Sequence, residues 1–292
     1  MADRVGTRTQ DTDETSGEDD PSGSDVASPA GAVPEPRPPR PWTLAVDIGG
    51  TGLKASVLDA RGAMVADRVK TATTYPMPPD KLVTVLTSLV APLPGFDRAS
   101  VGFPGMVRAG RVLSAPHFST TSGPGSETDP ELRERWSSFD LAAALTEAFG
   151  VPTKVANDAD IQGAAVVSGH GLELVITLGT GFGTGRFYDG PLMPHLELAH
   201  QVFHKGQTYN EQLGEEVRKE IGDGRWNKRV LKAIANMRAI FFFDHLYVGG
   251  GNSRRLVRDR LDDDVTIVDN SAGILGGIKL WESDHVGVND VG

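Results

Sequence analysis

The sequence lacks cysteine altogether among its 292 residues. Disulfide bonds, thiol nucleophiles and zinc sites built on cysteine are therefore excluded. Long apolar runs are missing too, since none approaches the roughly 18 residues that suggest a membrane helix. The chain opens Met-Ala-Asp-Arg and turns acidic, without the basic and apolar regions of a signal peptide. We therefore expect a cytoplasmic protein with no membrane partner.

Basic residues are not in excess either, because the formal net charge is −10. Nine acids and four bases lie in residues 1–40, which leaves 30 acids and 25 bases in the remainder. The part expected to fold is only mildly acidic and offers no strongly basic surface for duplex nucleic acid. We expect no nucleic-acid partner.

Large apolar side chains are almost absent from residues 1–41, which are rich in Ser, Thr, Gly, Asp, Glu and Pro. Such a segment cannot bury enough surface to offset the entropy of ordering, so a disordered tail is predicted. Its end, 34–41, is Pro-rich and predicts a stiff linker. Order begins at Trp42, and the remaining length suits one large or two ordinary domains.

The folded part alternates strand and helix patterns, which indicates the α/β class. In the first half we expect strands at 43–48, 53–58, 64–69 and 99–103, helices at 79–90 and 139–149, and an exposed loop at 119–130. In the second half we expect strands at 172–178, 186–188, 245–248 and 265–268, and helices at 209–221, 225–243, 256–261 and 272–281. A pair of strands joined by a glycine turn occurs twice, and two such units could hold a phosphate chain from both sides.

A strand ending in Asn157-Asp158 runs into a helical segment, and open α/β folds place ligands at such strand ends. Asp158 could accept a proton from a substrate hydroxyl, and Asn157 could orient that substrate. Both residues are also ordinary helix N-caps, so a purely structural role stays open.

Three glycine runs offer backbone N–H groups unshielded by side chains, which suits phosphate oxygens. The candidate phosphate-binding residues are Asp47, Gly49, Gly50, Thr51, Gly52, Lys54, Thr180, Gly181, Gly183, Gly250, Gly251 and Asn252. Asp47, at a strand end, could hold Mg²⁺ through water. The alternative is a set of glycine-rich hairpins without a ligand. The spacing of glycine and lysine differs from that of a Walker A loop.

Glu197 and His200 are three residues apart, so one helical turn would place them on one face. They could form a metal pair, hydrogen-bond a polyol, or belong to a polar loop; without cysteine or an obvious third ligand we favour the polyol. Glu211 is a further candidate acceptor, although an acidic residue near a helix N-cap has the same pattern.

Four basic residues recur at helical spacing, at i, i+3, i+4 and i+7: Arg225, Lys228, Arg229 and Lys232. Trp226, Val230, Ile234, Met237 and Phe241 supply the opposite, apolar face. The ordinary interpretation of these four residues is a solvated charged face of a helix. The more specific and less common interpretation is a binding site for a polyanion.

Six motifs, in this order, resemble the ROK family of sugar kinases, and most closely its polyphosphate glucokinase branch. They are Asp47-Ile48-Gly49-Gly50-Thr51-Gly52, Gly102-Phe103-Pro104-Gly105, Asn157-Asp158-Ala159, Leu178-Gly179-Thr180-Gly181-Phe182-Gly183, Glu197-Leu198-Ala199-His200 and Gly249-Gly250-Gly251-Asn252. The resemblance covers about residues 43–282. It implies an actin-like (ribonuclease H-like) two-domain fold, with domains at 42–155 and 156–271 and a final helix, 272–281, able to pack back on the first.

The resemblance further implies a hexose, most simply glucose, phosphorylated at its 6-hydroxyl by polyphosphate and/or ATP with Mg²⁺. Asp158 would be the general base, the glycine turns would hold the donor, and the protein would be a homodimer. The sugar would be held by Asn157, Glu197, His200, Glu211 and Gly105.

Three departures from the family pattern stand out. The zinc-binding cysteines of many members are missing, so His200 resembles a sugar ligand only and no zinc is expected. Ala199 stands where glycine is common, and His117 where asparagine is usual. The rival interpretation is a sugar-responsive regulator, but such relatives carry an amino-terminal DNA-binding helix-turn-helix, which the composition of residues 1–41 does not suggest. An actin-like filament protein would not need Asp158, Glu197 and His200 together.

Overall fold

The structure, a computed structural model, describes residues 38–268 and 276–281. The predicted disordered tail therefore lies outside the described residues, apart from 38–41. Within that short part Arg40 forms an ion pair with Asp97, and just after it the backbone N–H of Trp42 donates to the same carboxylate at 2.7 Å. Among the described helices, none combines the length and apolar character needed to cross a bilayer.

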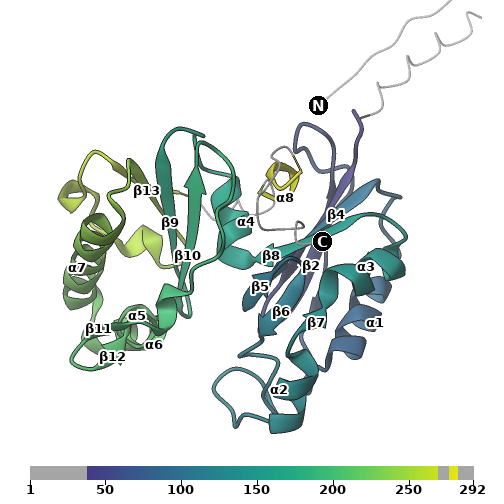
Figure 1. Ribbon diagram of the computed structural model, residues 1–292, viewed down its shortest axis with the longest axis horizontal. Helices are drawn as coiled ribbons and strands as arrows, with labels where there is room; N and C mark the ends of the chain where they lie inside the picture. Colours follow the sequence, from purple (N-terminus) through teal and green to yellow (C-terminus); the bar gives the residue numbers. More distant parts are fainter. Residues whose placement is uncertain (1–37, 269–275, 282–292) are drawn as a thin grey trace, which may run out of the picture. The chain divides into compact units, whose positions relative to one another are not determined.

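The first part of the chain contains one large sheet, a small sheet and three helices within the described residues (Figure 1). Its elements are β1 (Thr43–Ile48), β2 (Gly52–Leu58), β3 (Val69–Ala72), α1 (Pro79–Val90), β4 (Arg98–Phe103), β5 (Met106–Arg108), β6 (Arg111–Ser114), α2 (Pro130–Trp136), β7 (Phe139–Asp140), α3 (Leu141–Phe149) and β8 (Thr153–Asn157).

The second part begins with the helix that follows β8 and is built around another large sheet. Its elements are α4 (Asp158–Ala164), β9 (Leu172–Leu178), β10 (Phe182–Tyr188), η1 (Leu198–His200), β11 (Val202–His204), β12 (Gln207–Thr208), α5 (Tyr209–Leu213), α6 (Glu215–Ile221), α7 (Asp223–Phe241), β13 (His245–Gly249), η2 (Ser253–Arg255), η3 (Arg258–Arg260), β14 (Val265–Ile267) and α8 (Gly276–Lys279).

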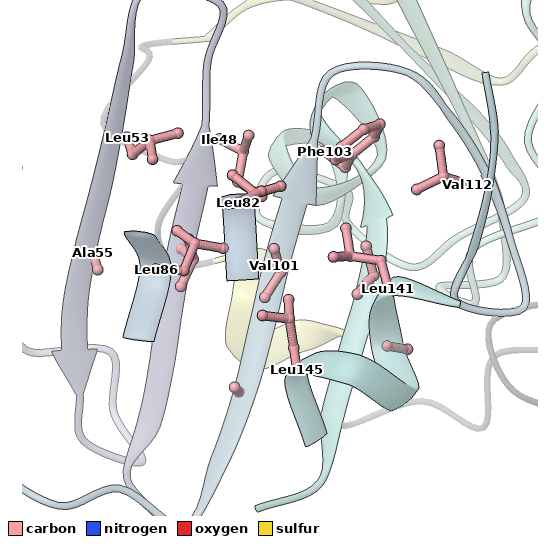
Figure 2. Packing of buried hydrophobic residues seen from close by; sticks show 14 of the residues in the cluster. Ile48, Leu53, Ala55, Leu82, Leu86, Val101, Phe103, Val112, Leu141 and Leu145 are labelled. Carbon is pink, nitrogen blue, oxygen red and sulfur yellow. The ribbon is translucent and has the colours of Figure 1, made fainter. Parts of the chain in front are cut away.

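The five-stranded sheet has the order β3-β2-β1-β4-β8, with β1, β4 and β8 parallel and the hairpin β1-β2-β3 antiparallel. Side chains alternate across it. Ile48, Val101 and Phe103 face the core shared with α1 and α3, as Figure 2 shows. Helix α1 contributes Leu82 and Leu86, four residues apart and fully buried, each stabilising the fold by roughly 1.5–3 kcal/mol. The predicted helix at 79–90 is confirmed.

The four-stranded sheet has the order β10-β9-β13-β14, with β9, β13 and β14 parallel and β10 antiparallel to β9. It repeats the hairpin-plus-parallel-strand pattern of the first sheet, so the predicted pair of glycine-turn units is confirmed. One face packs on α7 through Trp226 and Val230, and the other packs on α4 through Val175. Both faces of this sheet are therefore packed against helices.

Helix α4 packs against strands of both sheets, β4 and β8 on one side and β9 and β10 on the other. Helix α8 packs against α4, β1 and β4, on the face of the first sheet opposite α1. It is tied there by Ser100, whose hydroxyl donates to the Gly277 carbonyl at 2.5 Å. Residues at the start of α4 therefore lie where the two sheets come together.

Several predicted elements are wrong in detail. The strand expected at 64–69 is β3 at 69–72, with only an isolated bridge between Met64 and Leu58. The helix expected at 209–221 breaks at Gly214, whose extended backbone (φ −64°, ψ 165°) separates α5 from α6. The helix expected at 256–261 is replaced by the short 3₁₀ turn η3.

The loop expected to be exposed at 119–130 is exposed over most of its length, but it also folds back on itself. Thr120 bridges Thr128, and Ser119 and Thr120 are both 4% exposed. The helix α2 that follows begins at Pro130, with the Asp129 side chain accepting two backbone N–H groups as N-cap. That N-cap and Pro at the first position are helix-start signals that the sequence interpretation overlooked.

Candidate functional site

Asn157 and Asp158 lie at the junction of β8 and α4, as the sequence predicts. Asn157 is the N-cap of α4: its Oδ1 accepts the N–H of Ala159 at 2.8 Å, and its Nδ2 donates to the Gly105 carbonyl at 2.9 Å. This hydrogen bond therefore connects Asn157 to Gly105, and both are predicted substrate-binding residues. The sugar contacts of Asn157 and Gly105 stay predictions.

Asp158 is half-buried, and its Oδ1 also accepts the Ala159 N–H at 2.8 Å. Burial raises the pKa of its carboxyl to about 7; the Ala159 N–H opposes that rise, and the negative charges of Asp47, Asp160 and Glu197 add to it. A carboxylate with a pKa near neutrality is well matched to accept a proton at physiological pH. The fold thus creates a candidate general base.

A buried histidine lies between two carboxylates next to this base. His195 Nδ1 is 2.9 Å from Asp160 Oδ2, and His195 Nε2 is 3.5 Å from Glu197 Oε2. Burial alone would lower the pKa of His195, but the two carboxylates outweigh it and raise the pKa to about 10. Burial likewise favours neutral Glu197, but His195 holds the pKa of that carboxyl below its usual range.

The first glycine turn, 49–51, has its carbonyls turned toward neighbouring side chains. Thr73 Oγ1 donates to the Gly49 carbonyl at 2.7 Å and Tyr75 Oη to the Gly50 carbonyl at 2.6 Å. Among the described residues, the N–H groups of Gly50 and Thr51 have no acceptor. Adjacent free N–H groups are what an anion-binding turn requires.

The second glycine turn, 179–181, has a comparable arrangement. Gly179 N–H closes the turn on the Gly181 carbonyl at 3.0 Å, and no acceptor in the described chain contacts the N–H groups of Thr180 and Gly181. The third glycine run joins this turn, because Asn252 Nδ2 donates to the Gly179 carbonyl at 3.0 Å. Gly250 (φ +89°) passes so close to β9 that a Cβ would lie 2.3 Å from the Leu178 carbonyl oxygen.

The sequence also matches a known protein family. The profile of the ROK family matches residues 43–194, more than half of the chain. The chain belongs to the ROK family. Its fold is accordingly the actin-like (ribonuclease H-like) two-domain α/β fold, and the predicted fold class is confirmed. The boundary predicted between 155 and 156 stays a prediction.

Two relatives that align with most of the chain are kinases by name. Polyphosphate glucokinase of Mycobacterium tuberculosis is 25% identical over 256 residues, covering 82% of this chain and 91% of that protein. The crystal structure of inorganic polyphosphate/ATP-glucomannokinase from Arthrobacter sp. strain KM is 26% identical with a TM-score of 0.67, covering 84% of this chain and all of that one. A ROK family transcriptional regulator shares the fold at 15% identity and TM-score 0.61, covering 82% of this chain and 77% of its own.

The remaining predicted sugar-binding residues of this ROK protein lie on two short elements that pack together, η1 and α5. Glu197 caps η1, its Oε1 accepting the Ala199 N–H at 3.3 Å, and His200 is exposed at the end of that turn. Glu211 is exposed and engaged in a capping box, its Oε2 accepting from Thr208 N at 2.8 Å. The structure gives Glu211 the capping role that was the alternative, and its sugar role stays a prediction.

Asp47 and Lys54 face each other across β1 and β2, with Lys54 Nζ donating to Asp47 Oδ2 at 3.2 Å. Asp47 keeps an exposed carboxylate whose charge reaches Asp158. No cluster of three or more His, Cys, Asp or Glu side chains suited to a metal occurs in the described ranges. A single exposed carboxylate fits Mg²⁺, which is commonly held by one or two carboxylates, waters and substrate phosphates.

The basic stripe lies on α7 as predicted, with Arg225, Lys228 and Lys232 exposed and Arg229 half-buried. Arg229 Nη1 donates to the Gln212 carbonyl at 3.4 Å. Lys232 Nζ lies 3.3 Å from His204 Nδ1 and 5.4 Å from the centre of the Phe203 ring. The stripe therefore continues onto the hairpin β11-β12, where Lys205 adds another cation.

Sequence reasoning missed His195 and Asp160 as members of the site. Asp160 is two residues beyond the candidate base and is 2% exposed. No local pattern distinguishes it from a solvated acid on the first turn of a helix. The contact with His195 joins residues 35 positions apart and arises only when β10 and the segment after it pack on α4.

Proposed function

We propose that this protein is a hexose kinase that transfers a phosphoryl group from polyphosphate and/or ATP to the 6-hydroxyl of glucose. The observation that carries the proposal is Asp158, a half-buried carboxylate whose pKa is raised to about 7 at the junction of the two sheets. The relatives named above support the choice of donor and sugar.

In the proposed reaction, Asp158 accepts the proton of the sugar hydroxyl as that oxygen attacks the terminal phosphorus. The phosphorus–oxygen bond to the rest of the donor breaks, and the leaving oxygen keeps the electron pair. Asp158 has one carboxylate oxygen, Oδ1, bound to the Ala159 N–H, which fixes the orientation of the group. Positioning of the reactants supplies much of the rate in such reactions, of order 7–11 kcal/mol where alignment is good.

Glu197 is proposed to hold sugar hydroxyls as an ionised acceptor, together with His200. Its carboxylate is 17% exposed and stays ionised beside His195, so its lone pairs favour hydroxyl donors. Ala199, buried behind it, places a methyl group where a glycine would leave space.

The free N–H groups of the two glycine turns are proposed to bind the donor phosphates. Asp47 would hold Mg²⁺ through water, and the ion would neutralise charge on the phosphoryl group being transferred. Lys54, which pairs with Asp47, is proposed as a second cation for the same phosphates.

A coupled assay for glucose 6-phosphate, run in parallel with ATP and with polyphosphate, tests the proposal. We expect Mg²⁺-dependent turnover with at least one donor, and the ratio of the two kcat/KM values identifies the preferred one. Glucose binding without turnover on either donor would contradict the kinase proposal and favour a sugar-responsive regulator.

The pH dependence of the reaction follows from Asp158. Its ionised form is the one that accepts a proton, so kcat/KM is expected to rise with pH and to level off above an apparent pKa of about 7. Below that value the rate should fall about tenfold per pH unit. The measurement is kcat/KM between pH 5 and 8.5, with Asp259→Asn, a change of an exposed carboxylate on η3, as a control that keeps the same profile. If the acid limb of kcat/KM lies near pH 4, close to the pKa of an ordinary aspartate, the role of Asp158 as general base is contradicted.

A further inference from the structure

His195 is the one imidazole among the described residues with carboxylates on both ring nitrogens, Asp160 at Nδ1 and Glu197 at Nε2. The three side chains are 8%, 3% and 17% exposed. They come from three places in the chain: α4, the loop after β10, and the N-cap of η1. A polar group so deeply buried is normally retained only when its partners satisfy it.

Each nitrogen of His195 has a carboxylate to receive its proton, so the arrangement fits an imidazolium that donates in both directions. Burial raises the pKa of Asp160, and the hydrogen bond and positive charge of His195 oppose that rise. With both carboxylates ionised, the cluster carries two negative charges and one positive charge instead of two uncompensated negative ones. Glycine at position 185 of β10 leaves room for the Asp160 carboxylate, because a Cβ there would lie 3.2 Å from Asp160 Oδ1. Charged hydrogen bonds of this kind are stronger and more directional than neutral ones.

We propose that His195 is a positioning residue: anchored by Asp160, it holds the Glu197 carboxylate in place for the sugar and balances the negative charge that surrounds Asp158. This inference rests on the proposed function. It assigns to His195 no contact with the reacting atoms. Its effect reaches the reaction through two residues, Glu197 and Asp158.

The charge balance around Asp158 depends on groups from several elements. The acids are Asp47 on β1, Asp160 on α4 and Glu197 before η1. The positive charges are those of His195 and of Arg186 on β10, which both act on Asp160. His195 is the cation that contacts both Asp160 and Glu197. Removing it leaves two buried carboxylates facing the base without their shared partner.

Steady-state kinetics of three variants test the inference: His195→Gln, Glu197→Gln and the double substitution. We expect His195→Gln to raise KM for glucose about tenfold, as loss of one charged hydrogen bond would. Its acid limb of kcat/KM should move up by about half a pH unit or more, because an ionised base becomes less favourable. The double variant should have a KM close to that of Glu197→Gln alone, since His195 acts on the sugar through Glu197.

A purely structural histidine would behave differently. His195→Gln would then lower the melting temperature while leaving the glucose KM and the acid limb unchanged, or the two substitutions would add, and either result overturns the inference. His170→Gln, a change of an exposed imidazole on the turn before β9, is the matched control and should alter none of these quantities.

A readout that needs no turnover separates this inference from the kinase proposal. In the protein labelled with ¹⁵N-histidine, the ring missing from His195→Gln identifies His195 among the seven histidines. Its two ring nitrogens should both stay protonated from pH 6 to 9. A neutral His195 ring at pH 7.5 overturns the inference even if glucose is phosphorylated, and absence of turnover with an intact imidazolium overturns the kinase proposal alone.

Discussion

Replacing Asp158 with asparagine is expected to lower kcat by at least about 100-fold while glucose affinity stays within a few-fold. The amide has the shape of the carboxyl and can still accept the Ala159 N–H that orients Asp158. It cannot take the proton of the attacking hydroxyl. A loss in kcat without a matching loss in binding is the pattern of a group needed for the chemical step.

The measurements are kcat with the preferred donor and the glucose dissociation constant from titration calorimetry. Near-normal turnover would remove Asp158 from the base role. An equal loss of sugar affinity would instead make it a binding residue.

The stability of the same variant provides the folding control, and its sign follows from the raised pKa. The folded protein holds the Asp158 proton more tightly than the unfolded chain does, so this group's contribution to stability falls as pH rises from about 4 to about 7. Asp158→Asn removes that cost. We expect its melting temperature at pH 8 to equal or exceed that of the wild type, and the difference to shrink at pH 5.

Replacing Lys228, Arg229 and Lys232 together with glutamine is expected to lower kcat/KM for long polyphosphate by about 10-fold or more, with ATP turnover little changed. Each cation contributes roughly 0.5–1 kcal/mol when it pairs with a phosphate near the surface. A stripe from Arg225 to Lys232 extends about 10 Å along the helix. That length meets several successive phosphates of a chain, and it exceeds what the triphosphate of ATP needs.

The salt response is the second readout of this variant. Several ion pairs that form together are screened together, so wild-type kcat/KM for polyphosphate should fall steeply with added salt and the variant should respond less. Arg61, Arg108 and Arg133, three exposed cations of the first part of the chain, give a control of equal charge when replaced with glutamine. Equal losses for both donors, or none for either, would assign the stripe to the solvated surface.

The pKa of His204 is affected by the positive charges of the same basic surface. Its partial burial and the charges of Lys232, Lys205 and Arg229 hold the pKa of this imidazole below its usual range. The hairpin β11-β12 thus extends the basic surface beyond the four residues that the helical spacing identified. A bound polyanion would relieve that repulsion.

Local patterns were sufficient for much of the architecture. Strand, glycine turn and strand follow one another at 43–58 and again at 172–188, and the structure has antiparallel hairpins at both places. The apolar spacing of Pro79–Val90 and of the segment around Trp226 also identified α1 and α7. The Asn-Asp junction located the candidate base, because a polar pair directly after a buried strand lies at a sheet edge, where α/β folds bind ligands.

Patterns failed where distant segments decide the outcome. The break at Gly214 and the missing strand at 64–69 depend on what each segment packs against, which local propensity does not contain. The loop at 119–130 is polar in composition, yet it folds back over the first glycine turn, so that a Cβ at Gly50 would lie 2.9 Å from Pro124 Cγ. His117 Nδ1 would be 3.2 Å from the same position.

The sequence by itself determined the fold class, the two glycine-turn hairpins and the position of Asp158 at a strand end, since each depends on neighbours along the chain. Only the tertiary structure decided the chemistry of that position. The raised pKa of Asp158 arises from burial between two sheets and from the carboxylates of Asp47 on β1, Asp160 on α4 itself and Glu197 before η1. The contact of His195 with Asp160 joins α4 to a loop 35 residues away. Desolvation and through-space charge act over distance, not over sequence separation, and therefore appear only when the chain is folded.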